Sequence, residues 1–250
     1  MPPPSPASPG PQAPAGAAQA QPGQIVESQY DRTERTASLI AAGKHRNLIG
    51  GQWDAMGDLQ LDFLRRSGLM PEHRVLDIGC GCLRAGVKLI PYLEPDHYYG
   101  LDAEKALLDV GFHKELARAG IQDRLSRANL YASRLFIHRR LDPATIDMAI
   151  CNSVMTHLPL NYVRICLENT FGYFRDGASL FMTFFELPAG TRFSAPHTNT
   201  HGVTTNGASD PYHYTVSDMV HAAEGTGWAA SYIGEWGHPR GQAMMRYRRA

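Results

Sequence analysis

The apolar residues of this chain follow two alternating periods along most of its length. Short apolar runs typical of strands are separated by segments whose apolar residues lie three and four positions apart, as on one face of a helix. We predict strands at residues 75–79, 97–101, 123–130, 146–151, 179–185, 229–235 and 242–248. The alternation predicts an α/β domain with a mostly parallel sheet, closed by a hairpin between the last two strands.

Two predicted helices precede the first strand, one over residues 31–49 and one between Gly51 and Gly68. Four more are predicted after it: at 83–90, ending before Pro91; across Leu108, Phe112 and Leu116; at 163–174; and after Thr215-x-x-Asp218, a helix-capping signature. Residues 187–214 are polar and rich in Gly, Pro, Thr and His. Insertions of this length are usually functional or mobile.

Composition divides the chain further. Residues 1–24 contain no charged residue and 8 of the 17 prolines, so we interpret 1–26 as a disordered tail, 27–72 as an N-terminal helical cap or lid, and 73–250 as the main domain. The tail lacks the basic start and apolar run of a signal peptide, and no later stretch has 18 uninterrupted apolar residues. We therefore expect a cytoplasmic protein that does not insert into membranes.

The charge balance bears on partners. Lys and Arg number 24, as do Asp and Glu. This balance, without a basic stripe, argues against a nucleic-acid-binding module and favours a small-molecule partner. The four cysteines form no C-x-x-C pair, which fits a reducing compartment. The sequence does not indicate the oligomeric state.

The most informative segment follows the first predicted strand. Gly79 and Gly81 allow a sharp turn at the carboxyl end of that strand, where backbone can approach a ligand. Asp102 comes twenty-one residues after Gly81, at the end of the second strand, where a carboxylate can accept hydrogen bonds from both hydroxyls of a ribose. A purely structural turn followed by an ordinary strand-end acid is the alternative interpretation.

Two cofactor classes compete for this turn. A dinucleotide fingerprint needs a third small residue where Arg84 stands, counted from Gly79. Asp77 precedes the turn, and a carboxylate there would repel a pyrophosphate but suit a ligand with an ammonium group.

The residues of this turn resemble those of the class I S-adenosylmethionine-dependent methyltransferases. Their first motif matches Asp77-Ile78-Gly79-Cys80-Gly81, and Asp102 matches their ribose-binding acid. Residues 146–158 look like the family's fourth-strand region, and 176–180 like its Pro-Gly-Gly-x-Leu turn, with Asp176 and Ala178 as departures. The resemblance runs from about residue 72 to the C-terminus and is strongest to bacterial small-molecule enzymes, which the segments WDAMGDLQLDFL and HPRGQ also fit.

The resemblance implies a Rossmann-like seven-stranded sheet, mostly parallel with an antiparallel last strand, helices on both faces and an N-terminal helical cap. It implies binding of S-adenosyl-L-methionine and in-line transfer of its methyl group to a small-molecule acceptor, with release of S-adenosylhomocysteine. The implied cofactor-binding residues are Asp77, Gly79, Cys80, Gly81, Asp102, Ala103, Asn129, Cys151 and Asn152. The alternatives are a catalytically inactive cofactor-binding partner protein and an NAD-dependent oxidoreductase.

The acceptor is expected at the carboxyl ends of the parallel strands, beside residues 151–161, 187–214 and 236–241. His157 is the candidate general base, because it follows strand four by six residues and imidazole titrates near neutrality. Its alternative role is to bind backbone or cofactor at a helix start. Candidate acceptor-pocket or structural residues are Tyr212, His213, His238 and Arg240.

Two further site types are not expected. His197 and His201 lie four apart in a segment predicted as loop, where this spacing carries little weight, so no metal site is predicted. Enzymes that methylate exocyclic amines of nucleobases carry a Pro-Pro-aromatic motif after strand four, whereas this chain has Asn152-Ser153-Val154-Met155.

Overall fold

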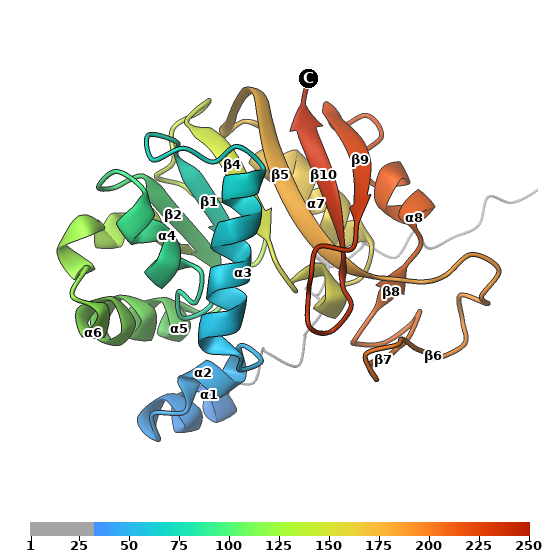
Figure 1. The fold of residues 1–250 in the computed structure, drawn as a ribbon, viewed down its shortest axis with the longest axis horizontal. Coiled ribbons are helices and arrows are strands. Elements are labelled where there is room, and N and C mark those ends of the chain that lie inside the picture. Colours follow the sequence, from blue (N-terminus) through green and yellow to red (C-terminus); the bar gives the residue numbers. More distant parts are fainter. Residues whose placement is uncertain (1–32) are drawn as a thin grey trace, which may run out of the picture.

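The computed structural model describes residues 33–250, so the predicted tail at 1–26 lies outside the described residues. A twisted sheet runs through the molecule (Figure 1). In sheet order its strands are β3 (Leu130–Ala132), β2 (Tyr98–Asp102), β1 (Val75–Ile78), β4 (Ile146–Cys151), β5 (Phe174–Glu186), β10 (Ala243–Arg249) and β9 (Trp228–Gly234). The first five are parallel, and β10 is antiparallel to both of its neighbours, as predicted.

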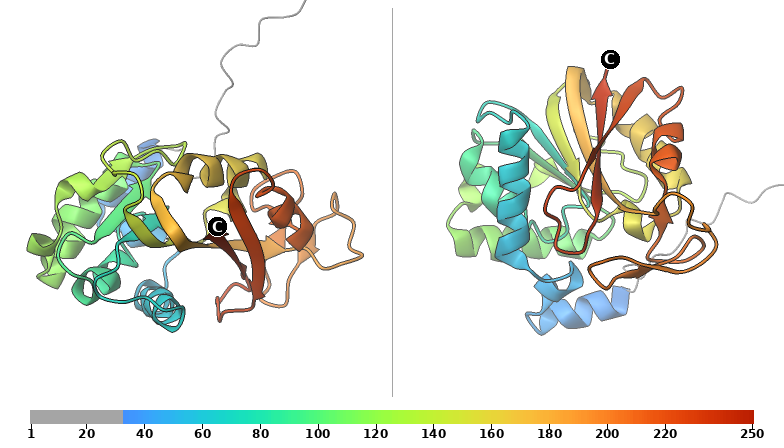
Figure 2. Two further views of the ribbon diagram at one scale, coloured as in Figure 1. Left: turned by 90° about the horizontal axis from the view of Figure 1, so that it is seen from above. Right: turned by 45° about the vertical axis from the view of Figure 1, so that its right-hand side comes forward.

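Helices cover both faces of the sheet. In chain order they are α1 (Thr33–Ala41), α2 (His45–Leu48), α3 (Trp53–Arg66), α4 (Gly86–Tyr92), α5 (Lys105–Val110), a π-helical turn (Gly111–Leu116), α6 (Ala117–Ala119), α7 (Asn161–Phe171) and α8 (Val216–His221). One core packs α3, α4 and α5 on the sheet, and a second packs α7 and α8 on the other face. Figure 2 shows α3 and α7 on opposite sides.

Strand β1 explains why two cores form. Leu76 and Ile78 point into the core beneath α7, whereas Val75 points into the core beneath α3 and α4. All four β1 residues are buried, as expected for a central parallel strand covered on both faces. The sheet therefore holds the carboxyl end of β1 in the middle of the molecule.

Several boundaries differ from the sequence predictions. The helix predicted at 31–49 is interrupted, because Gly43 takes a left-handed backbone between α1 and α2. The helix predicted at 83–90 begins only at Gly86, since Leu83 has a φ of 69°, and it continues through Pro91. The third strand, predicted at 123–130, starts at Leu130 and is preceded by two 3-10 turns.

Strand β5 starts earlier than the predicted 179–185, and where a turn was expected the pairing with β4 shifts register between Phe174 and Ser179, at left-handed Gly177 with a φ of +79°. The predicted capping signature is confirmed: Thr215 and Asp218 exchange side-chain and backbone hydrogen bonds at the start of α8. The insertion at 187–214 contains the short strands β6 (His197–Thr198), β7 (Thr204–Thr205) and β8 (His213–Tyr214), of which β8 pairs with β5.

The carboxyl ends of the parallel strands point to the lower edge of the sheet in Figure 1. At this edge lie α1 and α2, the insertion with β6 and β7, and the turn between β9 and β10. Segments that are distant in sequence thus gather where a ligand of an open α/β sheet is expected.

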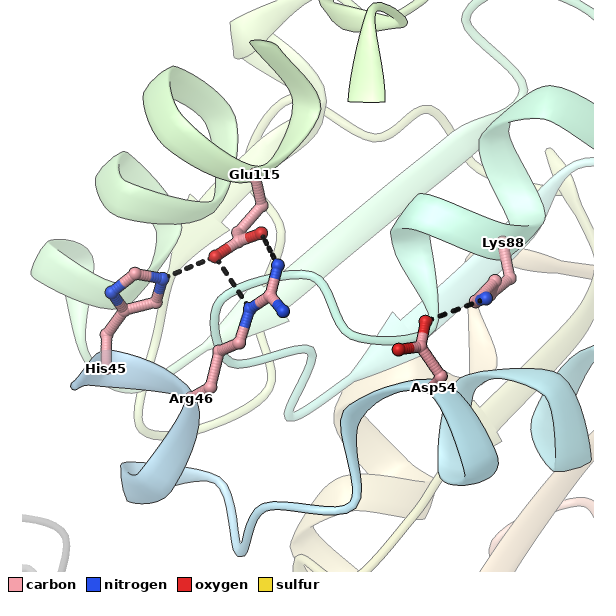
Figure 3. A network of polar contacts seen from close by, with 5 residues as sticks. All are labelled: His45, Arg46, Asp54, Lys88 and Glu115. Atoms are coloured by element: carbon pink, nitrogen blue, oxygen red, sulfur yellow. Dashed lines mark hydrogen bonds and ion pairs between the residues drawn. The ribbon is translucent and has the colours of Figure 1, made fainter. Parts of the chain in front are cut away.

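The N-terminal helices are tied to the main domain by a buried carboxylate (Figure 3). Glu115, in the π-helical turn, accepts from His45 Nε2 at 2.5 Å and from Arg46 Nε at 3.0 Å, and Arg46 Nη2 adds a bond of 2.5 Å. Burial alone would raise the pKa of Glu115, but the hydrogen bonds from Arg46 and His45 hold that pKa below its ordinary value. A second contact joins Lys88 of α4 to Asp54 of α3.

Across residues 33–250, none of the helices is both long enough and apolar enough to traverse a lipid bilayer.

Candidate active site

The turn after β1 contains two glycines, so its backbone there carries no side chain. Gly79 and Gly81 have left-handed φ angles of +75° and +55°. A Cβ added at Gly79 would lie 2.1 Å from Val154 Cγ2, and one added at Gly81 would lie 2.6 Å from Ile49 Cγ2. The N–H of Gly79 donates to the carbonyl of Leu101 at 2.7 Å, which fixes the turn to the end of β2. Only glycine fits both positions.

Asp102 lies at the carboxyl end of β2 beside this turn. Its Oδ2 accepts from the N–H of Gly81 at 2.8 Å, and its Oδ1 accepts from the N–H of Glu104 at 2.9 Å. Burial raises the pKa of Asp102, and the hydrogen bonds from these backbone N–H groups offset part of that rise. The resulting pKa is about 6. Because an ionised carboxylate has about four acceptor positions, Asp102 retains capacity for hydroxyl donors of a ligand.

Asp77 lies on β1 beneath the turn and is only 3% exposed. Its Oδ2 accepts from the Tyr98 hydroxyl at 2.7 Å. Burial raises the pKa of Asp77 to about 7, and the bond from Tyr98 and the charge of Arg84 offset only part of this rise. Asp77 does not line the hollows described below. It lies directly beneath the turn whose glycines line the first hollow.

A first hollow opens between the carboxyl ends of β1, β2, β3 and β4. Its wall includes five of the residues predicted to bind cofactor: Gly79, Gly81, Asp102, Ala103 and Asn152. Asn152 is 7% exposed, and within the described chain neither its Oδ1 nor its Nδ2 has a hydrogen-bond partner. A buried polar group without a partner costs about 1–3 kcal/mol. The first hollow therefore fits a ligand that hydrogen-bonds to this amide.

Asn129 does not reach the first hollow, contrary to expectation. Its Nδ2 donates to the carbonyls of Asp96 and Tyr98, at the amino end of β2 and so at the opposite edge of the sheet. The reason is the late start of β3, which places residue 129 before the strand. Residues after β3 line the hollow instead, among them Ser133, Arg134 and Phe136.

Two predicted cysteines also point away from the first hollow. Cys80 is 5% exposed and packs against Gly100 in the core beneath α4. Cys151 is fully buried beside Cys166 in the core beneath α7. Burial raises the pKa of both thiols, so neither is a reactive thiolate.

A second hollow adjoins the first and encloses about 330 Å³, against about 170 Å³ for the first. The residues common to both walls are Ile49, Arg84, Ser153 and His157. His238 and Arg240, two of the predicted acceptor-pocket residues, line the second hollow. Pockets of a few hundred Å³ hold small molecules.

His157 stands where the two hollows meet. Its Nδ1 lies 2.6 Å from Oδ1 of Asp210, a residue of the insertion. Oδ2 of Asp210 is buried and has no hydrogen-bond partner among residues 33–250. This pairing orients the imidazole and favours the tautomer whose Nδ1 carries the proton, so that Nε2 accepts one. The arrangement suits a general base.

The other two acceptor-pocket candidates hold the insertion together. The backbone N–H of Tyr212 donates to the carbonyl of Thr156 at 2.7 Å. His213 is fully buried, with Nδ1 3.0 Å from Thr205 Oγ1 and Nε2 2.9 Å from the carbonyl of Phe193. Neither Tyr212 nor His213 lines the two hollows described above.

Within the part of the chain that the structure describes, no group of three or more His, Cys, Asp or Glu side chains could hold a metal ion. His197 lies in β6, where its carbonyl accepts from Thr205 Oγ1, and His213 is held by Thr205 and Phe193.

Three wall residues, and Asp210 behind the wall, carry no signal in the sequence that predicts a place in the site. Ile49 precedes the Gly50-Gly51 break, and its packing on Gly81 has no local signal. Arg84 was noticed only as a departure from the dinucleotide pattern, yet its Nη1 donates to the carbonyls of Ile49 and Gly51. Ser153, and Asp210 behind the wall, become functional candidates only through partners brought close by the fold.

Comparison with known proteins agrees with this geometry. Residues 76–180 match the family model described as a methyltransferase domain. No curated protein matches the chain significantly.

Among solved structures, a putative O-methyltransferase from Nostoc punctiforme PCC 73102 is 13% identical, with a TM-score of 0.63 over 90% of this chain and 63% of its own. Magnesium protoporphyrin IX methyltransferase (ChlM) from Synechocystis PCC 6803, with bound S-adenosylhomocysteine, is 15% identical, with a TM-score of 0.57 over 86% of this chain and 97% of its own. DhpI, in complex with S-adenosylhomocysteine, is 16% identical, with a TM-score of 0.57 over 90% of this chain and 97% of its own.

These matches confirm the resemblance to S-adenosylmethionine-dependent methyltransferases drawn from the sequence, and the sheet order with its antiparallel β10 confirms the predicted fold class. The chain has the Rossmann-like methyltransferase fold, and its residues 76–180 are similar to the methyltransferase-domain family.

Proposed function

We propose that this protein transfers the methyl group of S-adenosylmethionine to a small-molecule acceptor by in-line displacement and releases S-adenosylhomocysteine. The observation that carries the proposal is the junction of the two hollows, where Ile49, Arg84, Ser153 and His157 belong to both walls. A donor in the first hollow and an acceptor in the second would meet there. Proximity of this kind is the main contribution a protein makes to methyl transfer.

The residues of the first hollow fit the cofactor. Asp102 has acceptor capacity for ribose hydroxyls, and the Asn152 amide lacks a partner within the described residues. The 79–81 turn offers backbone without side chains. When bound, the cofactor supplies a methyl group activated by a sulfonium.

His157 is proposed as the general base. An O–H or N–H nucleophile must lose a proton as it is methylated, and Nε2 of His157 can take it while Nδ1 donates to Asp210. Asp210 acts through His157 and is a positioning residue.

The N-terminal segment is proposed as the cap over this site. Ile49 packs on the 79–81 turn, and the carbonyls of residues 49–51 accept hydrogen bonds from Arg84 and Arg240. These contacts hold the segment across both hollows, where it would exclude water from the reacting groups.

The first test uses methyl-labelled S-adenosylmethionine and a small-molecule extract of the host cell. We expect a labelled product with the wild-type protein. His157→Gln should lower its rate of formation about 100-fold or more, the usual range for loss of a general base, without weakening S-adenosylhomocysteine binding. Asp210→Asn should lower the rate less and shift its pH profile. His221→Gln, in an exposed pair with Glu224, is the matched control.

Two results would refute the proposal. An inactive cofactor-binding protein would bind S-adenosylhomocysteine but label nothing in the extract. An NAD-dependent oxidoreductase would bind NAD in preference to S-adenosylhomocysteine in calorimetry.

A further inference from the structure

The two hollows differ in the charge of their walls. Asp102 and Glu104 line the first hollow together with arginines. The second hollow is lined by Arg84 and Arg240, and no Asp or Glu of the described chain belongs to its wall. A positively charged, partly enclosed wall favours a negatively charged ligand.

Three hydrogen bonds hold Arg240 in place. Its Nη2 donates to the carbonyl of Gly50 at 3.0 Å, its own N–H donates to His238 Nδ1 at 3.1 Å, and its carbonyl accepts from Asn199 Nδ2 at 2.8 Å. Within residues 33–250 no carboxylate pairs with Arg240. A guanidinium has five N–H donors, so one bond to a carbonyl leaves both its charge and most of its donors available to a ligand.

Two acceptor side chains of the wall, Gln242 and His238, are bonded to the protein itself. Gln242 Oε1 accepts from Ser153 Oγ at 3.0 Å and from Thr183 Oγ1 at 2.7 Å. His238 is 6% exposed, its Nδ1 accepts from Arg240, and its Nε2 lies 3.3 Å from Ser153 Oγ. Burial, together with the charges of Arg84 and Arg240, lowers the pKa of His238 to about 3, so His238 stays neutral.

Beside the Gln52 amide and His157, the wall offers a ligand the donors of the Arg240 guanidinium and of the Gln242 amide. The rest of the wall is largely apolar, with Met56, Phe185 and Val203 among its residues. A donor-rich end beside an apolar surface matches a compact organic molecule that ends in an oxyanion.

We propose that the methyl acceptor carries an oxyanion, a carboxylate or a phosphate, which Arg240 and Gln242 bind in the second hollow. This inference rests on the proposed function, because it treats the second hollow as the acceptor side of the site.

The test measures binding of small probes by calorimetry to protein saturated with S-adenosylhomocysteine. The anionic probes are benzoate and phenyl phosphate, and the neutral analogues of matching shape are benzamide and phenyl methanesulfonate. We expect at least one anion to bind about tenfold or more tightly than its neutral analogue, the size of effect that a hydrogen bond to a charged group supports. The stronger of the two anions identifies the oxyanion as carboxylate or phosphate.

Substitutions at Arg240 assign the effect to this site. Arg240→Gln should abolish the preference for the anion in protein kept saturated with S-adenosylhomocysteine, whereas Arg118→Gln, at an exposed arginine of α6, should leave the preference unchanged. Arg240→Glu should reverse the preference, so that benzylamine binds better than benzoate.

The inference is overturned if neither anion binds, if the neutral analogues bind as tightly, or if Arg240→Gln retains the preference. Failure of the wild-type protein to bind S-adenosylhomocysteine would instead be a failure of the proposed function.

Discussion

At the scale of single residues, the buried Asp77 and the partly buried Asp102, at the same edge of the sheet, have different surroundings. Asp102 accepts from backbone N–H groups of the turns that surround it, whereas the Asp77 carboxylate accepts from the hydroxyl of Tyr98. Burial raises the pKa of both carboxyls, to about 6 for Asp102 and to about 7 for Asp77, and hydrogen bonds from backbone N–H groups and from Tyr98, respectively, offset part of each rise.

Asp77→Asn is expected to change how the free energy of unfolding depends on pH. The folded-state pKa of about 7 lies above the ordinary value of 3.8, so the folded state binds this proton more tightly than the unfolded state. The resulting stabilisation is fully present below about pH 4 and is lost as pH rises to about 7. Between pH 5 and pH 8, the free energy of unfolding of the wild type should fall by about 2–3 kcal/mol more than that of Asp77→Asn. Urea unfolding at the two pH values measures this difference. The exposed Asp123→Asn is the control; equal slopes for wild type and Asp77→Asn would contradict the expectation.

At the scale of elements, the short α2 and the π-helical turn matter more than their lengths suggest. An isolated four-residue helix is not stable, so α2 depends on its contacts with the main domain. Glu115 provides those contacts through His45 and Arg46, and the Arg46 guanidinium also lies 4.2 Å above the ring of Trp53. These bonds place Ile49 over the 79–81 turn.

Glu115→Gln is expected to loosen this attachment. The substitution keeps the shape of the side chain but removes a charge that two donors share, at a cost of about 1.5–3 kcal/mol in the free energy of unfolding. S-adenosylhomocysteine affinity should fall as well, because Ile49 is no longer held against Gly81. Urea unfolding and calorimetry measure the two effects. Asp54→Asn breaks a pair in which Asp54 is 75% exposed and should have little effect; an equal loss in both variants would argue against the role of Glu115.

At the scale of the whole molecule, the site is built from distant parts of the chain. The cap segment, the turns after β1 and β2, the segment after β4 and the turn between β9 and β10 each supply wall residues. A ligand that bridges these parts binds only the folded state and must stabilise all of them together.

S-adenosylhomocysteine at a hundredfold excess over its dissociation constant is expected to add about 2.7 kcal/mol to the free energy of unfolding. For a domain of this size, this corresponds to a rise of roughly 5–10 °C in Tm. Thermal unfolding with and without the ligand measures the rise. Asp102→Asn should reduce it, and the same concentration of NAD should give little change; a larger rise with NAD would refute the assignment of cofactor.

Much of the fold was predictable because it depends on local patterns. The apolar runs of β1 and β4 and the capping box at Thr215 each act over a few residues. Strand β3 was misplaced because its three residues are too short for a distinct period, and the error carried Asn129 into the list of cofactor-binding residues.

By itself, the sequence determined the class of the fold, the turn at Gly79 and Gly81, and the acid at Asp102, because strand periodicity, glycine conformation and spacing along the chain are local properties. Only the tertiary structure decided that His157 pairs with Asp210, that Asp77 is covered, and that Arg240 lines a second hollow beside the first. Those facts depend on packing between segments up to 190 positions apart, as in the bond from Arg240 to Gly50, and no local pattern encodes such distances.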